Sequence, residues 1–142
     1  MRLFLKSGFV AALFLVFSVS LLAQDNTSTI EAVKLRANTM LKVAREKKWD
    51  ELYKYVVVVT GKHDKATRRR MEISDNATEE EIREKVAGWF KRLYEAPQPY
   101  GVVDVRLDDK DKSRALIEYI HEDIDGFYMV FVGGEWYYTL EY

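Results

Sequence analysis

The stretch YGVVDVRLDDKDKSRALIEYIHEDIDGFYMVFVGGEWYYTLEY, residues Tyr100–Tyr142, decides the fold. It holds four runs rich in Val, Ile, Tyr, Phe and Trp, the residue types that favour β-strands. These runs are Val102–Leu107, Ser113–His121, Phe127–Val132 and Glu135–Glu141. Turn residues separate them, and Gly133-Gly134 suits a two-residue hairpin loop, which needs positive φ. The stretch therefore predicts a four-stranded antiparallel meander at the end of the chain.

The first 23 residues have the order of a secretory signal peptide. Arg2 and Lys6 form a basic start, Phe9–Phe17 is an unbroken apolar run, and Ala23 is the expected last residue of the signal. The apolar stretch is shorter than the ~20 residues that a membrane span needs. We therefore expect a signal peptide over 1–23 and a single exported domain over 24–142, in the periplasm or outside the cell. An uncleaved anchor is the alternative.

Charge and composition argue against several classes of protein. Without the signal, the chain carries a net charge of about −3, because Arg2 and Lys6 are lost from 22 basic residues against 23 acidic ones. A nucleic-acid-binding domain is usually clearly basic, so no nucleic-acid partner is expected. The chain has no cysteine, and its two histidines, His63 and His121, lack metal-ligand spacing. With no Gly-rich phosphate loop or nucleophile elbow, no metal or cofactor is expected.

Two helical segments are expected soon after the signal. Ser28 and Glu31 read as a capping box, which predicts a first helix at about 29–47. Asp50 is the expected N-cap of a second, shorter helix. The run Val56–Thr60 favours a strand through its β-branched side chains, although it also suits the buried end of that helix.

A segment with several basic residues follows at 61–76 and contains Arg68-Arg69-Arg70. One interpretation is an anion-binding loop. The other is a solvated loop or short helical turn that packs over Met71 and Ile73, because nearby acidic residues dilute the positive charge.

A third helix is predicted at about 79–95. Thr78 and Glu81 form its capping box, and its apolar positions recur at helical spacing. We expect Trp89, Phe90 and Leu93 on this helix to pack against the sheet. The expected sheet partners are Val105, Ile117, Tyr119 and Tyr138.

Alternation along the strands assigns the two faces of the sheet. The inward sets are expected to be Val103, Val105 and Leu107; Ala115, Ile117, Tyr119 and His121; and Trp136, Tyr138, Leu140 and Tyr142. The third strand is apolar on both faces, so we expect it to be central or covered twice. The outward face carries Leu116, Ile120 and Tyr137 among charged residues, a mixture that a monomer rarely leaves open.

The order of elements resembles the nuclear transport factor 2-like superfamily. The resemblance covers about 29–142 and rests on that order, on the Trp49–Tyr55 segment and on the hairpin Gly133-Gly134-Glu135-Trp136. It implies an α+β fold in which N-terminal helices pack on a curved, mainly antiparallel sheet of four or more strands. The resemblance also implies a cone-shaped domain with a pocket between the helices and the sheet. In many members it implies a homodimer through the outer sheet face. Leu116, Ile120 and Tyr137 are the expected dimer-face residues.

The implied pocket gives two functional hypotheses. Its candidate lining residues are Tyr119, His121, Trp136 and Tyr138. The first hypothesis is an exported, non-catalytic domain that binds a small molecule or a protein. The alternative is a small-molecule isomerase or hydratase with His121 as general base and a tyrosine as acid. A strand-end histidine bonded to a turn explains His121 without catalysis, so the non-catalytic hypothesis is preferred.

Overall fold

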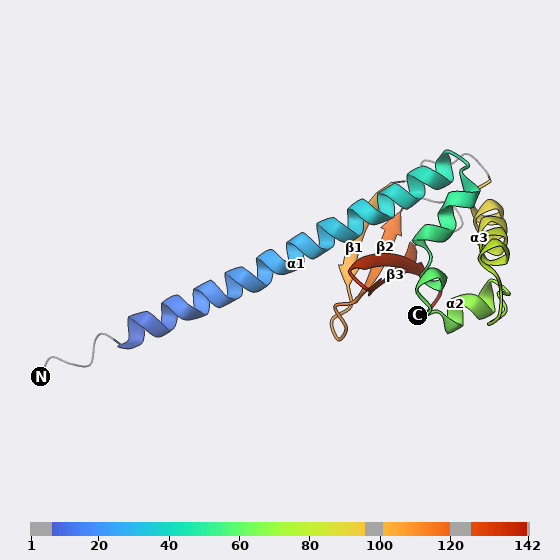
Figure 1. Cartoon of the computed structure of the whole chain (residues 1–142). Helices are drawn as coiled ribbons and strands as arrows, with labels where there is room; N and C mark the ends of the chain where they lie inside the picture. The colour runs from blue at the N-terminus through green and yellow to red at the C-terminus, as the bar shows by residue number, and fades with distance from the viewer. Residues whose placement is uncertain (1–6, 96–100, 120–125, 142) are drawn as a thin grey trace, which may run out of the picture. The chain divides into compact units, whose positions relative to one another are not determined.

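The structure is a computed structural model of the whole chain (Figure 1). The residues it describes are 7–95, 101–119 and 126–141. The chain divides into two compact units, Met1–Ala32 and Val33–Tyr142. The first contains the beginning of helix α1 (Ser7–Arg45), and the second contains the rest of α1 and all the other elements.

Helix α1 begins much earlier than the sequence predicted. The expected start was the capping box at Ser28, but this residue lies well inside α1. A capping box marks a helix start only where the preceding residues leave the helix. Here the preceding residues are mostly Leu, Ala and Phe, which tolerate the helix, and the short polar segment 24–27 does not interrupt it. Among the described residues, no helix is both long enough and apolar enough to cross a membrane.

Two short 3-10 helices, η1 (Trp49–Tyr55) and η2 (Val57–Thr60), follow α1. The predicted N-cap at Asp50 is wrong, because η1 already includes Asp50 and its N-cap position is Lys48. Val56 lies between the two helices and forms an isolated parallel bridge with Tyr138. The valine run is therefore neither a regular strand nor an α-helix. Val56, Val57 and Val58 of this run are buried, so packing rather than β-propensity decides its conformation.

The next two helices are α2 (Lys65–Arg70) and α3 (Glu79–Tyr94). The capping box of α3 is confirmed: the Glu81 amide donates to Thr78 Oγ1 over 3.3 Å, and the Thr78 amide donates to Glu81 Oε2 over 2.7 Å. Helix α3 packs closely against η1.

The predicted meander is confirmed. Its strands are β1 (Val102–Leu107), β2 (Arg114–Tyr119), β3 (Gly126–Val132) and β4 (Glu135–Thr139), paired in this order and all antiparallel. Gly133 and Gly134 adopt φ of 60° and 95°, as the hairpin requires. Helices and this sheet together make an α+β fold.

The predicted inward face is largely confirmed. Ala115, Ile117, Tyr119, Trp136, Tyr138, Leu140 and Val105 are all buried. Among the other predicted inward residues, Leu107 is half-buried and Val103 is 61% exposed, while His121 and Tyr142 lie outside the described residues. The register of β1 against β2 shifts between Val102 and Asp104, and such a bulge breaks the two-residue alternation on which the prediction relied. On β3, Phe127, Met129 and Val130 are buried, so this strand is covered on both faces.

The buried face of α3 differs by one position from the predicted one. Its buried residues are Val86, Phe90 and Tyr94, which succeed one another at four-residue spacing. Trp89 and Leu93, which were expected to be fully buried, are only half-buried. The centre of the stripe is therefore Phe90, and the indole of Trp89 lies at its margin.

Candidate binding surface on the outer face of the sheet

Three of the predicted pocket residues are part of the core. Tyr119, Trp136 and Tyr138 are buried, with 3–5% of their surface exposed. The hydroxyl oxygens of Tyr119 and Tyr94 are 2.8 Å apart, and Tyr138 Oη accepts a hydrogen bond from Trp89 Nε1 over 3.4 Å. His121 lies outside the described residues.

A connected aromatic cluster occupies the space between α3 and the sheet. Phe127 lies between Tyr119 and Tyr138, with ring centroids 5.2 and 5.5 Å away. Phe90 of α3 contacts Tyr138 at 5.1 Å and stacks on Tyr94 at 5.7 Å. Rings at these separations are in contact, so they fill this region with side chains.

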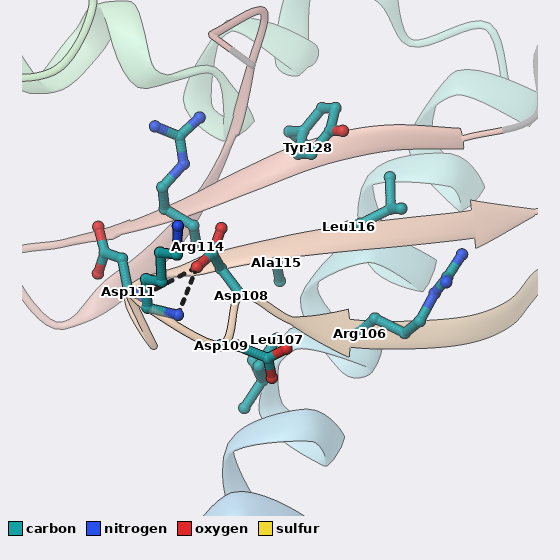
Figure 2. A pocket seen from close by; sticks show the side chains of 10 residues that line it. Arg106, Leu107, Asp108, Asp109, Asp111, Arg114, Ala115, Leu116 and Tyr128 are labelled. Atoms are coloured by element: carbon teal, nitrogen blue, oxygen red, sulfur yellow. Dashed lines mark hydrogen bonds between the residues drawn. The ribbon is translucent and has the colours of Figure 1, made fainter.

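A hollow of about 630 Å³ lies instead on the opposite, outer face of the sheet (Figure 2). We call it the outer hollow. Leu116 and Tyr128, which are directly paired across β2 and β3, form its apolar floor. Arg106 and Arg114 stand on its rim, and the β1–β2 loop Asp108–Asp111 closes one end.

The loop at the end of the outer hollow holds ionised carboxylates. The backbone amides of Asp111 and Lys110 donate to Asp108 Oδ1 over 2.9 and 2.7 Å and hold the pKa of Asp108 below its usual range. The hydroxyl and amide of Ser113 have the same effect on the pKa of Asp111. The outer hollow therefore presents negative charges near Arg114 at one end, while Arg106 lies on the other side of the hollow (Figure 2).

A second hollow continues the first along the same face. It is lined by Val103, Glu118, Tyr119 and Gly126, and it shares Arg106 and Leu116 with the outer hollow. Arg106 and Glu118 form an ion pair where the two hollows meet. We call the two hollows together the outer groove. It combines an apolar floor with charges of both signs.

Gly126 brings β2 and β3 close together beside the outer groove. A Cβ atom on this residue would lie 2.5 Å from the carbonyl oxygen of Ile117, which is closer than real Cβ atoms approach. Any larger residue would therefore force β3 away from β2 at this end of the groove.

The predicted dimer-face residues are only partly brought together. Leu116 lies in the outer groove, whereas Ile120 lies outside the described residues. Tyr137 contacts Arg36, whose guanidinium carbon is 5.7 Å from its ring, and burial together with Glu135 raises its pKa. Arg36 also lies 4.3 Å from the centre of the Tyr55 ring and pairs with Glu135, so Tyr137 belongs to a cluster at the β4 edge.

Tyr128 and Arg114 are groove residues that the sequence reasoning missed. Both follow from the pairing register, because Tyr128 is opposite Leu116 and Arg114 precedes Leu116 by two residues. Extending the alternation from the outward Leu116 across the hairpin could have identified them.

The three consecutive arginines have different environments. Arg68 is partly buried and pairs with Asp64, while Arg69 is exposed and lines a hollow with His63 and Lys65. Met71 and Ile73 are buried next to α2, which confirms the short-helix interpretation of this segment. In the described part of the chain, no group of His, Asp or Glu side chains is placed to hold a metal ion.

No protein-family model, curated protein or solved structure matches this chain. The function is therefore inferred from the geometry and chemistry of the outer groove.

Proposed function

We propose that this chain is an exported, non-catalytic protein-binding domain of nuclear transport factor 2-like type, and that it binds its partner in the outer groove. The observation that carries the proposal is the contrast between the two faces of the sheet. Aromatic side chains occupy the inner face, whereas the outer face has hollows with an apolar floor and a charged rim.

The character of the outer groove favours a protein over a small molecule. Small-molecule sites are usually concave and mostly apolar, and they enclose most of the ligand. Here Leu116 and Tyr128 are surrounded by Arg106, Arg114 and the acidic loop. Such a mixture is typical of non-obligate protein interfaces, which are about as apolar as ordinary protein surface.

A photoreactive phenylalanine analogue in place of Tyr128 should form covalent adducts with a protein in the native host. The aromatic ring is retained, so the fold should be unchanged, and the reactive group faces the groove. The readout is the mass of the adducts after irradiation. The same analogue in place of Leu35, which is 72% exposed on α1 outside the groove, is the matched control and should give few adducts.

Adding Leu116→Asp to the Tyr128 analogue should remove the adducts, because an unpaired carboxylate would be buried at the contact. The proposal is rejected if the Tyr128 and Leu35 positions give the same adducts, or if Leu116→Asp leaves the Tyr128 adducts unchanged in a protein that remains folded.

We also propose export with removal of residues 1–23. The basic start and short apolar run support this proposal. Protein isolated from the native host should therefore have an intact mass that corresponds to a chain beginning near Gln24. A cytosolic chain that still begins near Met1 would contradict it.

A further inference from the structure

We propose that a separate hollow beside helix α2 binds the phosphate group of an anionic ligand. This hollow, which we call the α2 hollow, has a volume of about 570 Å³. Its charged and titratable lining residues are His63, Asp64, Lys65, Arg69 and Glu141. It shares no lining residue with the outer groove, so this inference goes beyond the proposed function and does not depend on it.

Two cations of α2 line the α2 hollow together. Lys65 and Arg69 lie on the same side of the helix, because residues four apart are neighbours on a helix surface. Both residues are exposed, and neither makes an ion pair in the part of the chain that the structure describes. Two like charges at this spacing repel each other. An anion in the α2 hollow would relieve the repulsion, so the pair favours an anionic ligand.

The carboxylate of Asp64 does not cancel these two charges, because Arg68 already pairs with it. Arg68 Nε donates to Asp64 Oδ2, and both side chains are largely buried. Arg68 also donates to the carbonyl oxygen of Val58, which ties α2 to η2. The helix that carries Lys65 and Arg69 is therefore held in place before a ligand binds, and such preorganisation lowers the entropic cost of binding.

The loop before α2 brings His63 to the same hollow. Gly61 ends η2 with a φ of 64°, and His63 also has a positive φ, of 55°. Histidine adopts this conformation more often than most side chains do. The Lys62 amide donates to Thr60 Oγ1 over 3.0 Å and helps to hold the loop. His63 thus adds a third nitrogen donor to the two from α2.

These three donors suit a phosphate group better than a carboxylate. The Arg69 guanidinium can donate two parallel N–H bonds, the Lys65 ammonium is a compact charge, and the His63 imidazole donates one bond in either protonation state. A phosphate monoester offers three acceptor oxygens and a charge of about −1.5 to −2 at pH 7, whereas a carboxylate offers two oxygens in one plane and a single charge. Phosphate therefore matches the donors in both number and charge.

Two carboxylates oppose an anion at this site. Glu141 lines the α2 hollow, and Asp111 interacts electrostatically with His63. Lys65 and Arg69 still outnumber Glu141, so the α2 hollow keeps a positive charge when His63 is neutral. We therefore expect weak, reversible binding that becomes tighter when the Glu141 charge is removed.

Proton NMR of the chain isolated from its native host can follow the imidazole signals during a titration with inorganic phosphate at constant pH and ionic strength. The chain has two histidines, so the signal that His63→Asn removes belongs to His63. This signal should shift and saturate. Lys65→Gln and Arg69→Gln should each raise the dissociation constant about three- to fivefold, because each removes one exposed charge contact. Glu141→Gln should lower it.

Arg70→Gln is the matched control, because Arg70 is exposed on α2 but does not line the α2 hollow. It should leave the dissociation constant for phosphate unchanged. Vesicles of phosphatidylglycerol distinguish two sources of the phosphate group. Co-sedimentation that is lost in the Lys65→Gln/Arg69→Gln double variant would identify a lipid headgroup. Phosphate binding without such co-sedimentation would identify a soluble ligand.

The inference is overturned if inorganic phosphate leaves the His63 signal unmoved, or if acetate binds as tightly as phosphate. It is also overturned if Arg70→Gln weakens binding as much as Arg69→Gln, because that result indicates unspecific attraction to a basic surface. Circular dichroism of each variant separates loss of binding from loss of fold.

Discussion

Replacing Phe90 with alanine should lower the free energy of unfolding by about 3–5 kcal/mol, the usual cost of removing a fully buried phenylalanine. Phe90 has no exposed surface, and its ring contacts Tyr138 on β4 and Tyr94 on α3. It therefore joins the helix to the sheet at the centre of the aromatic cluster. Small domains are stable by only about 5–15 kcal/mol, so this loss is a large share of the total.

Chemical denaturation measures this effect, and Trp89→Ala is the matched control. Trp89 is the larger side chain, but it is only half-buried and contacts the margin of the cluster through its Nε1 hydrogen bond. We expect Trp89→Ala to cost less than Phe90→Ala. The reverse order would mean that the face of α3 is rotated by one residue and that the stripe is centred on Trp89 after all.

The sequence predicted those features that depend on local patterns. Alternation and turn residues identified the four strands, and the glycines of the last hairpin adopt the positive φ that their sequence indicated. The capping box at Thr78 marks the start of α3 correctly, because the residues before it are not helical. Where neighbouring residues agree with a local signal, the signal is sufficient.

The errors arise where neighbouring or distant residues override a local signal. The capping box at Ser28 has the same pattern as that at Thr78, but it is preceded by residues that continue the helix. The bulge in β1 turns Val103 outward, and the alternation of residue types along the strand does not predict this bulge. The outer groove brings together β1, β2 and β3, so Tyr128 and Arg114 become groove residues only once the pairing register is known.

Arg68→Ala, like Phe90→Ala, should destabilise the domain strongly. Arg68 is one of three consecutive arginines, but unlike Arg69 its side chain is largely buried. The Arg68 and Asp64 side chains are only 15% and 11% exposed, and Nε donates to Asp64 Oδ2 over 2.5 Å. Arg68 also donates to the carbonyl oxygens of Ser74 and Val58. Its removal would leave a poorly solvated carboxylate, and the carbonyl oxygen of Val58 would lose this donor, whereas that of Ser74 still accepts from the Ala77 amide. Breaking one partner of a buried pair costs about 3–5 kcal/mol.

A double-mutant cycle separates the ion pair from the carbonyl contacts of Arg68. Asp64→Ala alone should also destabilise the domain, because it leaves a partly buried guanidinium without its carboxylate. The double variant should cost less than the sum of the single ones, because no charge is then left unpaired. Arg69→Ala, next to Arg68 but exposed, should change the free energy of unfolding by no more than about 0.5 kcal/mol. Additive single effects would show instead that Arg68 stabilises the fold through its bonds to Ser74 and Val58, and that its pairing with Asp64 contributes little.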